Sequence, residues 1–189
     1  MIDQPIIIDN VISKIYQKEI ETFLLQTNFP WFFQDDITFQ KSEDPRAAFS
    51  NLIFDPKVGA GNPYNFLAPV LYNNTEIPVN QILQIRSFLL LPKGNNLNRI
   101  DPPHIDQPTP HLVGLYYVDD SEGNTIIYNK KYNPSEYAGA LSKVEISKLE
   151  VLTEIEPKQG RMVIFDGGFY HASTRPINKN RCVINYNFI

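Results

Sequence analysis

The sequence predicts an α+β domain in which N-terminal helices support an antiparallel β core, either a sandwich or a jelly roll. Early in the chain, apolar residues recur at helical spacing. From about residue 84 onward, short apolar runs alternate with clusters of Pro, Gly, Asn and Asp. No long helical pattern separates these runs, as the crossovers of a parallel sheet would require. At 189 residues the chain is long enough to bury a self-sufficient core.

The first half of the chain carries the expected helices. Between residues 11 and 26 the apolar positions fall near helical spacing, after the capping pair Asp9-Asn10. One or two further helices are expected within residues 62–84, broken by Asn73-Asn74 and Pro78. We therefore expect a single domain over residues 1–189, with residues 1–83 as a helical support region and residues 84–189 as the β core.

The second half carries the expected strands. They occupy residues 85–91, 111–118, 125–128, 149–155, 161–165 and 182–188. The gap over residues 129–148 is long enough for one helix or for a lid in which Tyr132 and Tyr137 face the substrate.

Composition excludes several classes of function. The chain has 17 basic and 21 acidic residues, so it lacks the basic surplus of a general nucleic-acid binder. Its one cysteine, Cys182, excludes a disulfide framework and a thiolate zinc site. No apolar run approaches the roughly 18 residues of a membrane span, and residues 1–5 lack the profile of a secretion signal. We expect a soluble cytoplasmic protein with a small-molecule or peptide substrate, and the oligomeric state is left open.

Two histidines and an aspartate form a candidate metal site. On a strand, His104 and Asp106 would point to the same face, about 6.6 Å apart along the chain. His171 follows the apolar run at residues 162–165 and a Gly-Gly turn. Two imidazoles and one carboxylate on different strands match the facial triad that binds Fe(II) and leaves coordination positions open. Without thiolates, Fe(II) or Mn(II) is favoured over structural zinc.

The last predicted strand alternates between a polar and an apolar face. Arg181, Val183, Asn185 and Asn187 share one face, whereas residues 182, 184, 186 and 188 share the other. The polar face could simply meet solvent. Alternatively it lines a cavity, in which Arg181 would bind a carboxylate with the planar, bidentate geometry of a guanidinium.

At this point the sequence resembles the 2-oxoglutarate- and Fe(II)-dependent oxygenases, in particular the prolyl-hydroxylase-like branch. The resemblance covers about residues 84–189 and rests on segments that occur in order. They are Pro103-His104-Ile105-Asp106, Leu115-Tyr116-Tyr117-Val118, Glu122-Gly123-Asn124-Thr125, Gly160-Arg161-Met162-Val163-Ile164-Phe165, His171 and Arg181.

The resemblance implies a double-stranded β-helix, that is, a jelly roll. It implies that His104, Asp106 and His171 are the iron ligands and that Arg181 binds the distal carboxylate of 2-oxoglutarate. Tyr117 matches the hydroxyl partner of that carboxylate, and Thr125 matches the family's Gly-x-Thr turn. The implied activity is a dioxygenase that uses Fe(II), 2-oxoglutarate and O2, with ascorbate as a candidate reductant. It would hydroxylate a prolyl residue in a peptide or a free amino acid.

One departure from the family concerns the inner carboxylate of 2-oxoglutarate. Many members place a tyrosine before a Pro-Gly turn near the cosubstrate, where this chain has Leu91. Arg86, Asn185 and Asn187 are the candidate replacements, and the sequence does not choose among them. We expect Asn185, together with Arg181, Tyr117 and Thr125, to bind the cosubstrate.

Several residues keep a second interpretation. His111 could be an alternative ligand, although the rim of a loop is the expected place for it. Arg175 competes with Arg181 for the carboxylate, Asp166 either orients His171 or forms a turn, and Tyr117 could be a core residue. The rival function is a non-catalytic, cupin-like jelly-roll module that binds metal or another ligand, which would not need a carboxylate clamp such as Arg181.

Overall fold

The computed structural model describes residues 2–37, 46–74, 76–92, 100–135, 141 and 143–189. Its helices are α1 (Lys14–Leu25), α2 (Tyr64–Tyr72) and α3 (Lys143–Ile146). Its strands are β1 (Ile6–Ile8), β2 (Phe32–Gln34), β3 (Ala48–Asp55), β4 (Gly59–Ala60), β5 (Ile82–Leu90), β6 (Leu112–Tyr117), β7 (Thr125–Lys131), β8 (Val151–Ile155), β9 (Met162–Asp166), β10 (Phe169–Ser173) and β11 (Arg181–Phe188).

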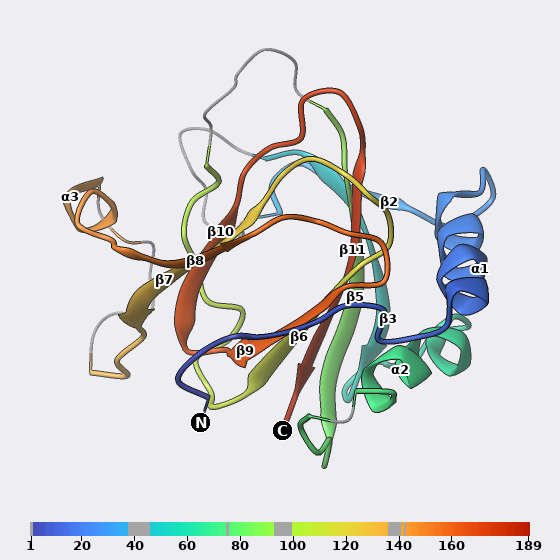
Figure 1. The fold of residues 1–189 in the computed structure, drawn as a ribbon, viewed down its shortest axis with the longest axis horizontal. Helices are drawn as coiled ribbons and strands as arrows, with labels where there is room; N and C mark the ends of the chain where they lie inside the picture. The colour runs from blue at the N-terminus through green and yellow to red at the C-terminus, as the bar shows by residue number, and fades with distance from the viewer. Residues whose placement is uncertain (1, 38–45, 75, 93–99, 136–140, 142) are drawn as a thin grey trace.

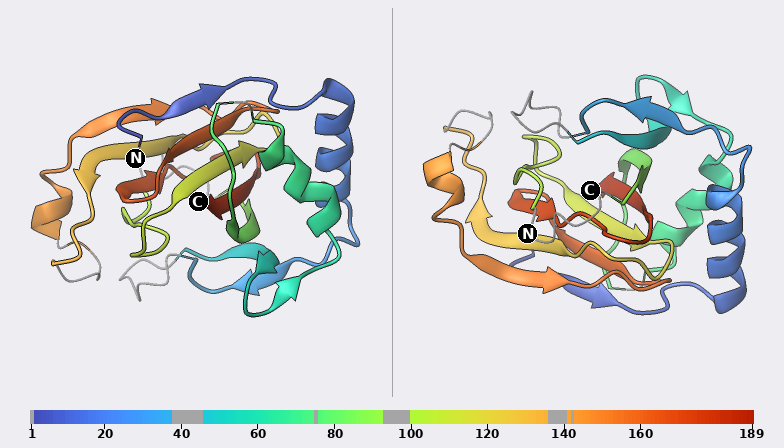
Figure 2. Two further views of the ribbon diagram at one scale, coloured as in Figure 1. Left: turned by 90° about the horizontal axis from the view of Figure 1, so that it is seen from below. Right: turned by 90° about the horizontal axis from the view of Figure 1, so that it is seen from above.

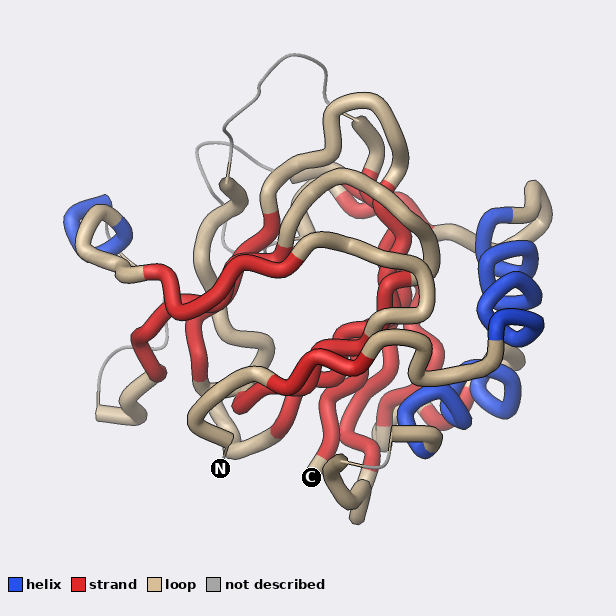
Figure 3. The backbone as a smooth tube through the Cα atoms, viewed as in Figure 1, coloured by secondary structure: helices blue, strands red, loops and turns tan. Residues whose placement is uncertain are grey.

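The strands form two antiparallel sheets that face each other (Figures 1 and 3). The larger sheet has the order β1-β9-β6-β11-β5-β3-β2, with β4 paired to β3, and the smaller has the order β10-β7-β8. Consecutive strands of the chain therefore often lie in different sheets, as they do in a jelly roll. The predicted α+β class with a jelly-roll core is confirmed.

Alternation along the strands of the larger sheet builds two cores. Tyr117 and Val183 belong to a cluster between the two sheets, together with Val113, Ile127, Ile155, Val163, Phe165 and Phe169. Tyr116 and Ile184, their neighbours along β6 and β11, belong to a separate cluster that also contains buried residues of α1 and α2. Successive residues of a strand point to opposite faces, so the helices cover the outer face of the larger sheet, as Figure 2 shows.

Helix α1 begins later than the capping pair at residues 9–10 predicts. The side chain of Ser13 accepts a hydrogen bond from the backbone N–H of Tyr16 at 3.3 Å, and this cap starts the helix at Lys14. The buried residues Gln17, Ile20 and Leu24 follow at spacings of three and four, which is the stripe of a helix packed on a core.

The first 83 residues contribute strands as well as the helices expected of them. Strand β1 pairs with β9 at one edge of the larger sheet, and β3 pairs with β5 near the other. The segment expected to hold one or two helices holds α2, and it ends in the start of β5 at Ile82. β1 and β3 are strands because they pair with strands that are distant in the sequence, and the local sequence pattern does not predict such pairing.

Candidate metal centre and adjoining pocket

His104, Asp106 and His171 lie together, with one potential ligand atom from each within 4.8 Å of the others. Oδ1 of Asp106 is 3.8 Å from Nε2 of His104 and 3.4 Å from Nε2 of His171. The two imidazole rings are tilted by 50° with centroids 4.6 Å apart. The structure thus brings together all three residues predicted as metal ligands, and their donor set of two imidazole nitrogens and one carboxylate suits Fe(II).

Backbone pairing positions the two histidines. The N–H of each histidine donates to the carbonyl oxygen of the other at 2.9 Å, which forms an isolated antiparallel bridge between His104 and β10. Gly167 and Gly168 reverse the chain between β9 and β10, so His171 faces the space between the sheets two residues into the new strand. A Cβ atom at Gly167 would lie 2.2 Å from the ring of His111, so this turn needs a residue without a side chain.

Each ligand is also oriented by a hydrogen bond on its far side. Nδ1 of His104 lies 3.1 Å from the carbonyl oxygen of Pro102, and Nδ1 of His171 lies 3.2 Å from that of Phe169. If Nδ1 donates in both cases, Nε2 of both rings is left as a lone-pair donor for a metal. Nδ2 of Asn185 donates to Oδ2 of Asp106 at 2.8 Å, which leaves Oδ1 for the metal.

The charge states of His104 and Asp106 suit a divalent cation. Burial and, to a smaller extent, the nearby His171 lower the pKa of His104 to about 4, so this ring is neutral at pH 7. Burial by itself would raise the pKa of Asp106, but the hydrogen bond and charge of His171 outweigh it and hold this pKa below its usual range. Burial lowers the pKa of His171, whereas the hydrogen bond to Asp106 raises it, and the net direction is upward.

Arg181, Thr125 and Tyr117 form a second buried group. The Thr125 hydroxyl oxygen accepts hydrogen bonds from Nη2 of Arg181 at 2.8 Å and from the Tyr117 hydroxyl at 2.7 Å. Arg181 is 4% exposed, and none of the described residues accepts a hydrogen bond from its Nε. A buried guanidinium with an unused donor is suited to a carboxylate ligand.

A cavity of about 520 Å³ connects the two groups. It is lined by His104, Asp106, His171, Thr125 and Arg181, together with the inner faces of β5 and β11. Its volume lies within the roughly 300–1,000 Å³ of small-molecule sites. The polar face of β11 therefore lines a cavity instead of meeting solvent. Tyr117 is fully buried between the sheets and reaches the cavity wall through its contact with Thr125.

The comparisons with known proteins fit this geometry. No protein-family model and no curated protein matches the sequence. Among solved structures, a prolyl hydroxylase from Trichoplax adhaerens, in complex with a hypoxia-inducible-factor peptide, matches with a TM-score of 0.62 at 14% identity, over 98% of this chain and 84% of that one. A 2OG-Fe(II) oxygenase family member from Burkholderia pseudomallei matches with a TM-score of 0.60 at 10% identity, over 97% and 84%. The chain has the fold of the 2-oxoglutarate/Fe(II) oxygenases.

The oxygenase fold includes enzymes with different reactions. The epimerase SnoN of nogalamycin biosynthesis, solved in complex with Fe3+, α-ketoglutarate and nogalamycin RO, matches with a TM-score of 0.58 at 11% identity, over 99% of this chain and 79% of that one. At such low identities the likeness establishes the fold, and the reaction has to be argued from the site.

The structure gives Asn185 a contact that the sequence did not predict. It lines the cavity, but its amide donates to Asp106, so its predicted contact with a cosubstrate stays a prediction. Leu91 is half exposed and is not among the residues that line the cavity. Arg86 and Asn187, the other candidates for the inner carboxylate, both line it.

The sequence did not predict a buried ion cluster that lies at the Arg181 end of the cavity. Asp101 contacts the guanidinium of Arg46, accepts from Nε of Arg175 at 2.9 Å and accepts from the Ser173 hydroxyl at 2.8 Å. The competitor Arg175 is thus engaged by Asp101 and does not line the cavity. Asp101 precedes His104 by three residues in Asp-Pro-Pro-His, but only the fold brings Arg46 to it.

The structure shows the positions of His111 and Asp166, each of which had two interpretations in the sequence. His111 is 5% exposed, so the expected position at a loop rim is wrong, and it lies outside the metal group. Its carbonyl oxygen accepts from the Gly167 N–H, because His111 directly precedes β6 beside the β9–β10 turn. Asp166 forms that turn: it accepts from the N–H of Gly168 at 2.9 Å and from Lys131 at 2.8 Å.

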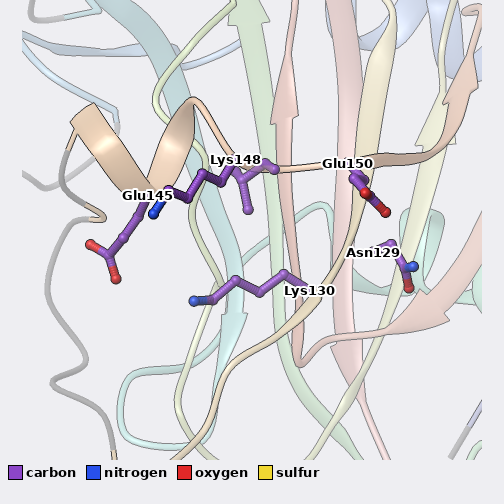
Figure 4. Close-up of a pocket in the computed structure, with 6 residues that line it drawn as sticks. Asn129, Lys130, Glu145, Lys148 and Glu150 are labelled. Atoms are coloured by element: carbon purple, nitrogen blue, oxygen red, sulfur yellow. The ribbon is translucent and has the colours of Figure 1, made fainter.

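Residues 129–148 contain the end of β7 and the short helix α3. Tyr132 packs against a small cluster behind the smaller sheet, and Tyr137 lies outside the described residues. Next to α3 is a second hollow of about 270 Å³, lined by Asn129, Lys130, Glu145, Lys148, Leu149 and Glu150. Figure 4 shows that side chains of both charge signs share its wall. It lacks the histidines and buried guanidinium of the larger cavity.

In the part of the chain that the structure describes, no helix has both the length and the apolar character needed to cross a lipid bilayer.

Proposed function

We propose that this chain is an Fe(II)- and 2-oxoglutarate-dependent dioxygenase that hydroxylates a prolyl residue in a peptide or a free amino acid. The observation that carries the proposal is one cavity with a His-Asp-His group and, in its wall, a buried arginine with an unused donor. The structural neighbours, which include prolyl hydroxylases, support the same class.

The residues present fit the proposed metal and cosubstrate. His104, Asp106 and His171 would hold the iron through Nε2, Oδ1 and Nε2. Arg181 would pair with the distal carboxylate of 2-oxoglutarate, beside the hydroxyl of Thr125. When bound, iron and cosubstrate supply the activation of O2 that oxidises a C–H bond, while 2-oxoglutarate becomes succinate and CO2.

The chain itself contributes binding and orientation. The hydrogen bonds from the histidine Nδ1 atoms and from Asn185 fix the ligands before metal arrives, which reduces the reorganisation that binding requires. Arg181 neutralises one carboxylate at a buried position, where a charge–charge contact is strong. The apolar side chains of Phe88, Leu115 and Val183 form part of the cavity wall.

The rival function is a cupin-like module that binds a metal or another ligand without catalysis. Arg181 argues against it, because a metal-binding module has no use for a buried guanidinium beside its metal. Burial of an arginine is costly unless an anion compensates it.

The test is a screen of peptides and metabolites for substrate-dependent succinate formation in the presence of Fe(II), 2-oxoglutarate and O2. The wild-type chain should form succinate together with a product heavier by one oxygen atom. His171→Ala should form none. Full succinate formation by His171→Ala would refute the proposal.

A further inference from the structure

The Arg181 end of the cavity contains two hydrogen-bonded pairs that lie side by side. Thr125 on β7 accepts a hydrogen bond from Nη2 of Arg181 at 2.8 Å. Ser173 on β10 donates one to Oδ2 of Asp101 at 2.8 Å. Thr125 and Ser173 are directly opposed in the register of β7 and β10, and opposed residues on one face of a sheet have Cβ atoms about 4.5–5.5 Å apart. Asp101 therefore lies near Arg181, and both line the cavity.

A free negative charge on Asp101 would oppose the proposed cosubstrate, which brings a carboxylate to the same end of the cavity. Asp101 is 4% exposed, so water does little to screen its charge. Like charges in a buried site repel each other strongly, and Asp101 would also compete for the guanidinium of Arg181. Binding of the cosubstrate at Arg181 is therefore favoured only if the charge of Asp101 is compensated.

Arg46 supplies such compensation from behind the cavity wall. Its guanidinium contacts Oδ2 of Asp101 and is 4% exposed, but Arg46 is not among the residues that line the cavity. Backbone contacts fix its position shortly before β3. The N–H of Arg46 donates to Oδ1 of Asp36 at 3.3 Å, and its carbonyl oxygen accepts from the N–H of Ile37 at 2.9 Å.

The surroundings of Arg46 also favour an additional anion. Burial lowers its pKa, and the charges of Arg181 and Arg175 lower it further. Nη2 of Arg46 is buried, and none of the described residues accepts a hydrogen bond from it. A buried guanidinium close to other guanidiniums is costly until negative charge offsets it. An anion that binds to Arg181 would therefore be stabilised by the charge of Arg46 as well.

We propose that Arg46 is a positioning residue for the distal carboxylate of 2-oxoglutarate: it neutralises Asp101 in the cavity wall, so that the carboxylate can bind to Arg181. The inference rests on the proposed function. Arg46 acts on the cosubstrate by its charge and through Asp101, without touching the ligand. It therefore provides part of the preference of the chain for a 2-oxo acid with two negative charges over one with a single negative charge.

A pair of ligands isolates this effect. 2-Oxoglutarate and 2-oxopentanoate have the same number of carbon atoms and the same 2-oxo acid group, but only 2-oxoglutarate has a distal carboxylate. Contacts to the metal and to the inner carboxylate are common to both ligands. They cancel in the ratio of the two affinities, whichever residue binds the inner carboxylate. The ratio therefore reports on the distal carboxylate alone.

The experiment is anaerobic calorimetric titration of the full chain, loaded with Fe(II), with each of the two ligands. Arg46→Met removes the guanidinium, so Asp101 is compensated only in part. The preference for 2-oxoglutarate over 2-oxopentanoate should fall at least about tenfold. The control Lys18→Met also removes one positive charge, but from the exposed pair with Glu21 on α1. It should keep the wild-type preference.

Asp101→Asn tests the same inference in the opposite direction. It removes the negative charge with little change of shape, so the preference for 2-oxoglutarate should rise at least about threefold. A cluster that only stabilises the fold would weaken both ligands equally in either variant and leave the preference unchanged. Thermal midpoints show which variants are folded at the temperature of the titration. If Arg46→Met is not folded, the result for Asp101→Asn decides.

The outcomes separate this inference from the function on which it rests. If the wild-type chain binds 2-oxoglutarate with Fe(II) but the folded variants keep its preference, the inference alone is refuted. A lower preference in Asp101→Asn also refutes the inference alone, because it contradicts the role of the Asp101 charge. Failure of the wild-type chain to bind 2-oxoglutarate refutes the proposed function and the inference together.

Discussion

Asn185 donates a hydrogen bond of 2.8 Å to Asp106, and this contact joins the last strand of the chain to the metal site. Asp106 lies in the loop before β6, so its carboxylate depends on β11 for orientation. The contact occupies Oδ2 and leaves Oδ1 facing Nε2 of both histidines. The ligand group is therefore preorganised by residues that do not themselves bind the metal.

Removal of this contact should weaken metal binding. Asn185→Ala should lower the affinity for Co(II), a spectroscopic substitute for Fe(II), by about 10–100-fold, the usual effect of losing a group that orients a ligand. Titration followed by the visible absorption of Co(II) measures the affinity. Asn178→Ala is the control on the surface. Unchanged affinity in Asn185→Ala would show that Asp106 is held by other means.

Replacement of Arg181 by lysine should weaken 2-oxoglutarate binding although the charge is kept. Lysine lacks the planar pair of donors and cannot reproduce the bond of Arg181 to Thr125 in the same geometry. Loss of one charge-assisted hydrogen bond corresponds to about 1.5–3 kcal/mol, or about 10–150-fold in affinity. Anaerobic calorimetry with Fe(II) present measures this. The matched control is Arg161→Lys, whose guanidinium pairs with Asp9 outside the cavity, and equal affinity of both variants would contradict the assignment.

Asp101 should be needed for stability. It contacts the guanidiniums of Arg46 and Arg175, which are 4% and 6% exposed, so Asp101→Ala removes a carboxylate that two buried charges share. Breaking a buried ion pair from one side costs about 3–5 kcal/mol, which urea denaturation would measure. Lys18→Ala breaks the surface pair with Glu21 and should cost at most about 1 kcal/mol. Equal small losses in both variants would show that the cluster is not important for stability.

Asp119 should contribute a loss of stability as the pH rises from about 4 to 6. Burial raises the pKa of this carboxyl to about 6, from an ordinary value near 4. In that window the unfolded chain has lost the proton while the folded chain still holds it, so ionisation favours unfolding. Asp119→Asn should flatten this part of the curve of unfolding free energy against pH. An identical curve for the variant would contradict the raised pKa.

The grouping of His104, Asp106 and His171 could be predicted because part of the signal is local and because the segments around these residues resemble those of the oxygenase family. His104 and Asp106 are two residues apart, and alternation predicted that Arg181 and Asn185 share one face of β11. The sequence left open whether that face meets solvent or lines a cavity, and the structure places it in the cavity wall. The contacts that need the whole fold could not be predicted. The bond from Asn185 to Asp106 joins residues 79 apart in the sequence, and that from Arg175 to Asp101 joins residues 74 apart.

Strands of the first half escaped prediction for a related reason. β1 is only three residues long, and it is a strand because it pairs with β9. The burial of His111 was also hidden, since it depends on the turn at Gly167 that passes over its ring.

The most direct test of the account is the visible absorption of the anaerobic protein with Fe(II) and 2-oxoglutarate. Chelation of the ferrous ion by the 2-oxo acid gives a charge-transfer band, and we predict this band for the wild-type chain and its loss in His171→Ala. Absence of the band from the folded wild-type chain, or its persistence in His171→Ala, would contradict the assignment of His104, Asp106 and His171 as one iron site.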